Sequence, residues 1–292
     1  MQLHSDPNGL IDLHLHTTFS DGSLPPEEVV RLARSRGVGT LAITDHDSTG
    51  GVEPAIAAGI EADVQVVPGV EISAHDEDRE VHMLAYGLEL HKHPRLNELL
   101  AEIRESRRER LLAMIEALRA QGIDLDPADV LPPGQTAPAR PHLARALIDG
   151  GHAGSIREVY DRFIGPDCEA YVGKMKVSLA DAAQLVHDAG GVAILAHPGS
   201  RYKEAKLDEF MAMGLDGLEV YHARQARRFS KRLRAYAMSR DLLITGGSDF
   251  HGDGYPTTEI GDSTQPRHDF EALLSALRER SARPENTAGA QS

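Results

Sequence analysis

The sequence predicts an α/β protein, a barrel related to the (β/α)8 type with a small helical domain inserted near its middle. Short apolar runs alternate along the chain with amphipathic stretches of helical length, which is typical of parallel βα units. About seven such units are expected, too many for a small sandwich, so closure into a barrel is the economical arrangement. The 292 residues, 41% of them hydrophobic, suffice for one large core and a small insert.

In the first part of the predicted barrel, two helices separate the first three apolar runs. Helix 25–36 begins at a Pro-Pro pair and ends before Gly37, as helices prefer. Helix 51–61 follows the second strand. The strands of this part are expected at 10–13, 40–44, 64–67 and 81–88. The last part repeats the alternation, with strands at 192–195, 217–220 and 242–245 among helices at 180–189, 203–213, 226–239 and 268–280.

Between these parts the alternation breaks. A long charged helical pattern covers 94–121, and a Pro- and Gly-rich loop and two shorter helices at 141–149 and 155–164 follow. No strand pattern occurs over 101–168. We therefore predict a barrel formed by 1–100 and 179–280, a helical insert at 101–178 that caps the active site, and a disordered polar tail at 281–292.

Composition excludes several classes of protein. The formal charge of −14 argues against general coating of nucleic acids, although it leaves room for a local basic patch. The insert carries 11 Lys and Arg against 12 Asp and Glu, so nearly all of the net charge falls on the barrel. Cys168 is alone and forms no internal disulfide. The first residues lack the apolar segment of a signal peptide, and no apolar run could span a membrane, so we expect a cytoplasmic protein without an evident obligate protein partner.

The first candidate site is the run from Asp12 to His16, followed by Asp21 in a turn-like stretch. Residues two apart on a strand point to the same face, so His14 and His16 can reach one ion together. The alternative is a polar strand end with an ordinary turn. This alternative loses weight because similar clusters follow other predicted strands.

His46 lies between Asp45 and Asp47 after the second strand, where the two carboxylates fit either turn chemistry or the orientation of His46. Glu71 alternates with apolar neighbours at what is predicted to be a strand end, and one carboxylate can bridge two cations. His82 begins the next predicted strand. It is explained equally well as a metal ligand or as a polar residue whose hydrogen bonds are made within the protein. Further along, His197 ends a buried strand, and Asp249 and His251 repeat the spacing of the first cluster among glycines.

The arrangement of these segments carries more weight than any one of them. Six segments each place His, Asp or Glu at a predicted strand end, and parallel strands of a barrel end on one face. The side chains are therefore expected to converge. Their nitrogen and oxygen donors suit Mn²⁺, Fe²⁺, Zn²⁺ or Mg²⁺, and the sequence does not choose among these ions.

These motifs resemble the polymerase and histidinol phosphatase (PHP) domains, in order and in the mixture of ligand types. The resemblance covers roughly 10–100 and 178–262. It implies a distorted (β/α)7 barrel that holds two or three divalent ions, with Mn²⁺ expected first. It also implies nine metal ligands: His14, His16, Asp21, His46, Glu71, His82, His197, Asp249 and His251.

The insert carries a narrower resemblance, to bacterial nucleoside 3′,5′-bisphosphate phosphatases and 5′-to-3′ exoribonucleases. It rests on arginines of the long helix, on Arg140-Pro141-His142, and on the segment from Gly165 to Lys174. Arginine presents a planar fork of donors that suits phosphate. The alternative for the helix arginines is a solvated face paired with neighbouring glutamates. The predicted substrate-binding residues are Arg104, Arg107, Arg108, Arg140, His142 and Lys174.

These residues predict a phosphatase that removes the 3′-phosphate of nucleoside 3′,5′-bisphosphates and also acts on short 5′-phosphorylated oligonucleotides. In this scheme Glu71 bridges two ions. His222, at another strand end, is the candidate acid that protonates the leaving group. An equally good interpretation is that His222 is an outer-sphere or surface histidine. The alternatives are a histidinol phosphate phosphatase, which leaves the basic insert unexplained, and a non-catalytic metal-binding accessory module.

Overall fold

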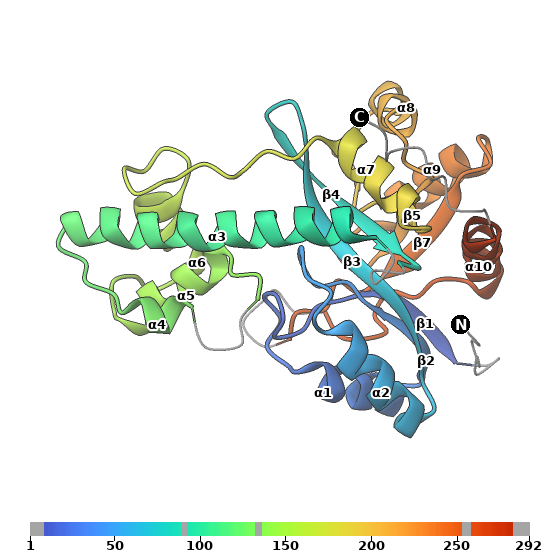
Figure 1. Cartoon of the computed structure of the whole chain (residues 1–292), viewed down its shortest axis with the longest axis horizontal. Helices are drawn as coiled ribbons and strands as arrows, with labels where there is room; N and C mark the ends of the chain where they lie inside the picture. The colour runs from blue at the N-terminus through green and yellow to red at the C-terminus, as the bar shows by residue number, and fades with distance from the viewer. Residues whose placement is uncertain (1–8, 89–92, 132–135, 253–257, 283–292) are drawn as a thin grey trace.

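A seven-stranded sheet with its strands in sequence order forms the centre of the protein (Figure 1). The computed structural model describes residues 9–88, 93–131, 136–252 and 258–282. Most residues of its strands are buried, as expected for a sheet covered by helices. They are β1 (Leu10–Leu15), β2 (Val38–Ile43), β3 (Gln65–Asp76), β4 (Arg79–Tyr86), β5 (Val192–Leu195), β6 (Gly217–His222) and β7 (Leu243–Gly247).

Helices connect the parallel strands and bury one apolar stripe each. In α1, for example, Val29, Val30 and Ala33 face the core while the acidic first turn stays outside. The barrel helices are α1 (Pro26–Ser35), α2 (Val52–Ala62), α7 (Leu179–Asp188), α8 (Glu204–Ala212), α9 (Arg227–Met238) and α10 (Arg267–Ser281). Across the described ranges, no helix combines the length and apolar character needed to cross a membrane.

The expectation of parallel strands throughout is wrong at β4. β4 runs antiparallel to both β3 and β5, whereas the other paired neighbours are parallel. The reason is the short connection between Asp76 and Arg79, where Glu77 adopts a left-handed φ of 55°. Such a tight turn can only reverse the chain, so β3 and β4 form a long hairpin.

The sheet bends into a barrel that, among the described residues, no continuous ladder closes. β1 and the segment after β7 meet in a single parallel bridge between Leu15 and Phe250, and the Asp249 backbone N–H donates to the His14 carbonyl at 2.9 Å. Gly247 permits this approach, since a Cβ there would lie 2.4 Å from His14 Cβ. The α/β class and the distorted barrel with seven strands are thus confirmed.

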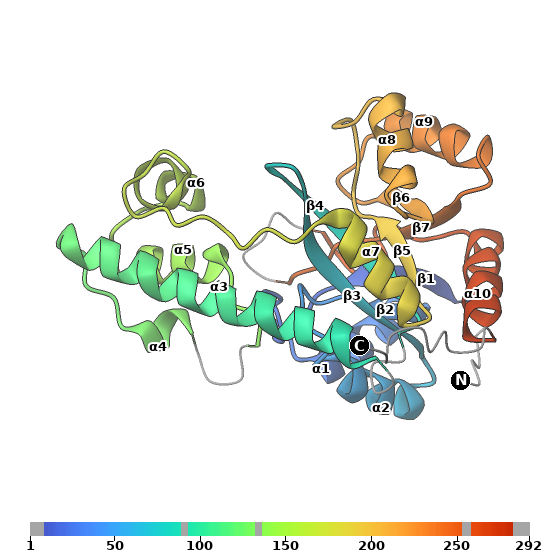
Figure 2. The same ribbon diagram turned by 45° about the horizontal axis from the view of Figure 1, so that its top comes forward.

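The inserted helices form a second layer of structure beside the barrel, which we call the cap (Figure 2). It comprises α3 (Pro94–Ala120), α4 (Pro127–Val130), α5 (Arg140–Asp149), α6 (Ile156–Val159), the π-helical turn Tyr160–Ile164 and the connecting segment 165–177. Leu111, Met114, Leu143 and Val159 belong to a core of its own.

The cap and the barrel share α3. Leu96 and Leu100 at its start pack in the barrel core, so the expected boundary at residue 101 falls inside this helix. The predicted loop around Pro132–Pro133 and most of the predicted tail, 283–292, lie outside the described residues.

Candidate metal centre

The nine predicted ligands come together at one edge of the barrel. His14 lies in β1 and His16 directly after it, and both are fully buried. His46 follows β2, while His197 follows β5. Asp249 and His251 follow β7, as the sequence predicts. His197 and Asp249 have φ angles of 30° and 55°, a strained backbone that is common where side chains must be aimed at a functional site.

Glu71 and His82 reach the same edge from inside strands, which corrects their predicted places at a strand end and a strand start. β3 continues past Pro68, its last residue paired with β2, and Glu71 bridges to His46 in this extension. His82 lies in the first half of β4. Because β4 is antiparallel to its neighbours, its first half points to the edge where the parallel strands end.

Glu71 lies at the centre of the cluster, in contact with most of the other predicted ligands. Its Oε1 lies 2.9 Å from His197 Nε2 and 3.1 Å from His82 Nδ1. Its Oε2 lies 3.2 Å from a ring nitrogen of each of His14, His16 and His46. Five imidazoles therefore surround one carboxylate whose side chain is 1% exposed.

Donor atoms from eight of the nine residues fall into three overlapping groups, each compact enough to hold an ion. His197 is in none of these groups and contacts the cluster through Glu71. Within each group one atom per residue lies within 4.8 Å of the others. Glu71 belongs to two of these groups. In another group, Asp21 Oδ1 lies 3.3 Å from His251 Nε2. The groups are His16, Asp21, His46 and His251; His14, His16, Glu71 and Asp249; and His46, Glu71 and His82.

The charges in this cluster are strongly coupled. Burial alone would raise the pKa of Glu71, but the neighbouring imidazoles, His46 and His14 first, hold it well below its usual range. Burial opposes a proton on His16, yet contacts with Asp249 and Glu71 raise its pKa to about 10. For His46 burial prevails and lowers the pKa to about 3. Carboxylates held ionised among imidazoles are a suitable environment for a cation.

The donor chemistry fits divalent metal ions. His14 Nε2 and His16 Nε2 lie 3.2 Å apart and point to the same carboxylate oxygen. Two imidazole nitrogens can share such a point only through a proton or a cation. Imidazole and carboxylate donors without sulfur suit Mn²⁺, Fe²⁺ or Zn²⁺. The cluster therefore has the composition and convergence of a metal centre.

Two buried carboxylates support this cluster. Glu219 was not predicted, and Asp12 was predicted within the first cluster but without this role. Glu219 Oε1 lies 3.0 Å from His14 Nδ1, and its Oε2 accepts the His197 backbone N–H at 2.7 Å. Such a carboxylate fixes the orientation of a ligating imidazole. Asp12 accepts the backbone N–H groups of Ser248 and Gly261 at 2.9 Å. The sequence does contain a sign of the role of Glu219, because this carboxylate lies between Leu218 and Val220 in an apolar strand.

Asp45 and Asp47 form hydrogen bonds that fix backbone loops, and they do not orient the ring of His46. Asp45 accepts hydrogen bonds from the Thr17 backbone at 2.7 Å and the Ser20 hydroxyl at 2.6 Å, which fixes the loop after β1. Asp47 accepts from the Ser73 backbone at 2.7 Å and from Arg107. These carboxylates therefore stabilise the backbone from which the ligands project.

His222 lies at the end of β6 and touches a predicted ligand. Its Nε2 is 3.2 Å from Asp249 Oδ2, and its Nδ1 accepts the Arg224 backbone N–H at 3.1 Å. Because Nδ1 accepts, the proton of the neutral ring sits on Nε2. Arg224 also pairs with Asp249 Oδ2 through its side chain.

The predicted substrate-binding residues separate into two sets. Arg107 donates to Asp47 and Ser73, and Arg104 donates to the Asp47 carbonyl at 2.9 Å, so both tie the cap to the barrel. Arg108 is exposed on α3. His142 caps its own helix through a bond between Nδ1 and the Ala139 backbone N–H at 3.0 Å.

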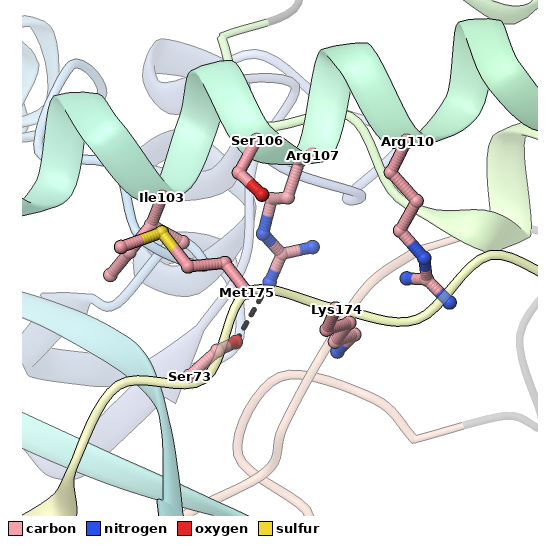
Figure 3. Close-up of a pocket in the computed structure, with 7 residues that line it drawn as sticks. All are labelled: Ser73, Ile103, Ser106, Arg107, Arg110, Lys174 and Met175. Atoms are coloured by element: carbon pink, nitrogen blue, oxygen red, sulfur yellow. Dashed lines mark hydrogen bonds between the residues drawn. The ribbon is translucent and has the colours of Figure 1, made fainter.

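The remaining set, Arg140 and Lys174, joins Arg110 in a basic cluster beneath α3 (Figure 3 shows Arg110 and Lys174). Arg110 and Arg140 stack on the ring of Tyr171, with 5.6 and 5.7 Å between guanidinium carbon and ring centroid. Burial, and then the charge of Arg140, lower the pKa of Arg110 to about 10. Its Nη2 has no hydrogen-bond partner among the described residues. Lys174 pairs with Glu80, whose Oε1 is 3.1 Å from His82 Nε2, and so connects this cluster to the metal centre.

Comparison with known proteins agrees with this site. The PHP domain family matches residues 12–124. The 5′-3′ exoribonuclease Rnm of Escherichia coli K12 is 36% identical, with 88% of this chain and 90% of that protein covered. The 3′,5′-nucleoside bisphosphate phosphatase of Chromobacterium violaceum is 35% identical, covering 86% and 90%. A phosphoribosyl 1,2-cyclic phosphate 1,2-diphosphodiesterase of Eggerthella lenta is also 35% identical, covering 82% and 94%.

A solved structure from Bifidobacterium adolescentis, assigned by inference as a metal-dependent phosphoesterase, has a TM-score of 0.83 at 33% identity. The similarity covers 94% of this chain and 98% of that one. Fold, ligand cluster and relatives together define a metal-dependent hydrolase of phosphate esters. The chain belongs to the PHP family, and its ligand cluster lies where the sequence resemblance implies.

Proposed function

We propose that the protein hydrolyses the 3′-phosphate of nucleoside 3′,5′-bisphosphates, such as adenosine 3′,5′-bisphosphate. The observation that carries this proposal is the basic cluster of Arg110, Arg140 and Lys174 beside the metal centre. A substrate with a single phosphate needs only the metals. Two convergent guanidinium groups call for a second anion, and phosphate suits their donors.

The metal complement we propose is two or three divalent ions, with Mn²⁺ first and Fe²⁺, Zn²⁺ or Mg²⁺ as alternatives. The nine ligands named above would hold them, and Glu71, shared between groups, would bridge two positions. Divalent cations in such a site activate water and offset the negative charge of the phosphoryl group. The protein groups around them fix the positions of the ligands and of the substrate.

In the proposed reaction, the oxygen of water forms a bond to phosphorus while the bond from phosphorus to the 3′ oxygen breaks. The products are the nucleoside 5′-monophosphate and inorganic phosphate. The 3′ oxygen takes up one proton as it leaves, and the Nε2 proton of His222 is our candidate source. The proton that the attacking water releases returns to the ring, so that His222 ends the reaction in its starting state. The ring holds this proton at the edge of the cluster, 3.2 Å from Asp249.

Replacing His222 by Asn is expected to lower kcat on adenosine 3′,5′-bisphosphate by about 10²-fold, because a poor leaving group needs a proton. p-Nitrophenyl phosphate, whose leaving group is stable as an anion, should lose less than about 5-fold under the same general-acid argument. Steady-state kinetics of both substrates, with metal content measured in parallel, provide the test. Equal losses on the two substrates would show that His222 only orients Asp249.

Replacing Arg140 by Ala is expected to raise KM for adenosine 3′,5′-bisphosphate by about 10- to 100-fold, the loss of one charge-assisted contact of roughly 1.5–3 kcal/mol. KM for p-nitrophenyl phosphate should stay unchanged. Arg157→Ala is the control, since Arg157 lies in the cap with its side chain 91% exposed. An unchanged KM for the bisphosphate in R140A would remove the cap from our account of substrate binding.

A substrate panel on Mn²⁺-reconstituted protein tests the proposed function itself. It compares adenosine 3′,5′-bisphosphate, histidinol phosphate, a ribose 1,2-cyclic phosphate and short 5′-phosphorylated oligonucleotides. We expect the bisphosphate to have the highest kcat/KM, and oligonucleotides to be the second class, as the names of the exoribonuclease relatives suggest. Preference for histidinol phosphate or the cyclic ester would replace our proposal, and no turnover at all would favour a non-catalytic module.

A further inference from the structure

A second basic feature lies outside the cap, on α9 and the turn before it. From Arg224 to Arg240 the chain has seven Arg or Lys and no Asp or Glu, although the whole protein carries a charge of −14. In a strongly acidic protein such a segment concentrates positive potential on one face, where it attracts polyanions. The seven cations are Arg224, Arg227, Arg228, Lys231, Arg232, Arg234 and Arg240.

Four of the seven cations have structural partners, and Arg224 is the first of them through its ion pair with Asp249. Arg232 donates to the carbonyls of Gly199 and Tyr202 at 3.1 Å each. Arg234 donates to the Tyr221 hydroxyl at 2.9 Å, and Arg240 pairs with Asp208. These contacts explain their presence without a ligand.

Arg227, Arg228 and Lys231 differ from that set. All three are exposed, and in the part of the chain that the structure describes they make no ion pair with a carboxylate. Residues three or four apart share a face of a helix, so Arg227, Arg228 and Lys231 form one stripe across the first two turns of α9. Phe229, half-buried, lies beside the stripe with the Arg228 guanidinium 4.7 Å from its ring centroid.

The chain runs directly from the metal centre into the stripe. β6 ends at His222, which contacts Asp249, and Arg224 pairs with the same carboxylate before α9 begins at Arg227. The cap lies at the other end of the molecule from α8 and α9 (Figure 2). A mononucleotide bound between the metals and the cap therefore has no phosphate near the stripe, whereas a longer strand could follow it.

We propose that Arg227, Arg228 and Lys231, which we call the α9 stripe, bind the downstream backbone phosphates of a single-stranded oligonucleotide whose 5′ end lies at the metal centre. Regularly spaced cations beside an aromatic ring are a typical single-strand surface. A lipid surface fits less well, because the apolar side of α9, with Leu233, Tyr236 and Ala237, is buried in the barrel core. The inference rests on the proposed function and assigns a binding surface to oligonucleotides, the second substrate class named there.

The first test is a direct binding measurement that does not depend on catalysis. Full-length protein is titrated into a 3′-fluorescein-labelled, 5′-phosphorylated RNA decamer in EDTA, and fluorescence anisotropy gives Kd. The variant R227Q/R228Q/K231Q is expected to raise Kd on the order of 10-fold at 0.1 M salt. It should also flatten the slope of log K against log salt by about 2, since each single-strand phosphate contact contributes about 0.7.

The matched control is R31Q/R34Q/R278Q, which removes the same charge from exposed positions of α1 and α10. Loss of binding in both triple variants would reduce the effect to net charge and overturn the proposal. So would a Kd and a salt slope equal to wild type in R227Q/R228Q/K231Q. The same decamer as DNA should lose binding equally, because the stripe is proposed to read phosphates. Vesicles of phosphatidylserine should bind neither protein, and stripe-dependent vesicle binding with unchanged RNA affinity would reassign the stripe to membranes.

Kinetics on Mn²⁺-reconstituted protein separate this inference from the proposed function. For wild type, kcat/KM on 5′-phosphorylated RNA should rise with length from two to ten nucleotides, and the stripe variant should lose this rise while turning over adenosine 3′,5′-bisphosphate normally. Failure to hydrolyse the bisphosphate would defeat the proposed function and leave the binding result standing. Wild-type length dependence in the variant would defeat the stripe alone.

Discussion

Replacing Glu71 by Gln is expected to empty the metal centre and to lower kcat/KM on phosphate esters by at least about 10³-fold. Changing a group that only supports a metal ligand already costs about 10- to 100-fold, and Glu71 is itself the shared donor. Its two oxygens lie within 2.9–3.2 Å of five imidazoles. The amide of Gln has nearly the same shape but lacks the charge that offsets bound cations.

Metal content by mass spectrometry and kinetics on reconstituted protein measure this effect together. Glu61→Gln is the control, since Glu61 is exposed on α2 and belongs to none of the three ligand groups. E61Q should keep wild-type metal content and activity. If E71Q kept both as well, Glu71 could not be the bridging ligand and the assignment of the cluster would fail.

The second large effect is expected at the buried ion pair between Asp47 and Arg107. Arg107 Nη2 lies 2.6 Å from Asp47 Oδ2, and the two side chains are 8% and 0% exposed. Asp47→Ala would leave the Arg107 charge buried without its partner, which should cost about 3–5 kcal/mol of unfolding free energy. The change should also loosen α3 from the loop that carries His46, and so raise KM for the bisphosphate.

Thermal or urea unfolding of D47A, R107M and the double variant D47A/R107M separates the pair from its surroundings. The double variant should recover much of the stability, because neither charge remains buried alone. Arg119→Met is the control on the same helix, where an exposed pair with Asp124 should contribute no more than about 1 kcal/mol. A loss in D47A no greater than in R119M would mean that the pair does not hold the cap.

The clustering of the proposed ligands could be predicted because their signals are local. His14 and His16, like Asp249 and His251, are two residues apart at the end of an apolar strand, and that spacing survives any detail of the fold. The convergence of the strand ends then follows from barrel topology alone. This is why errors in the strand boundaries did not disturb the ligand set.

β3 and β4 were harder to predict for reasons that lie in the hairpin itself. Pro68 and Gly69 interrupt the apolar run, so the sequence suggests a strand that stops where β3 in fact continues to Asp76. The charged stretch around Glu77 looks like a loop, yet it is the exposed tip of a hairpin. The direction of β4 depends on that turn, and a periodic pattern carries no information about direction.

The roles of the arginines depend on contacts that are distant in sequence. Arg107 looks like part of a solvated charged face because Glu105 and Glu109 flank it, but its partners Asp47 and Ser73 belong to the barrel. Arg110, with the same local pattern, turns toward Arg140 and Tyr171 instead. A helical pattern shows which residues share a face, and only the tertiary structure shows what that face meets.

Anomalous diffraction from crystals of the Mn²⁺-loaded protein tests the central claim most directly. We predict two or three manganese peaks at the edge of the barrel, each within about 2.0–2.4 Å of donors from one of the three ligand groups. One of the peaks should be bound by Glu71 together with His14, His16 and Asp249. Protein that is active with Mn²⁺ but shows no manganese within reach of these side chains would contradict the account.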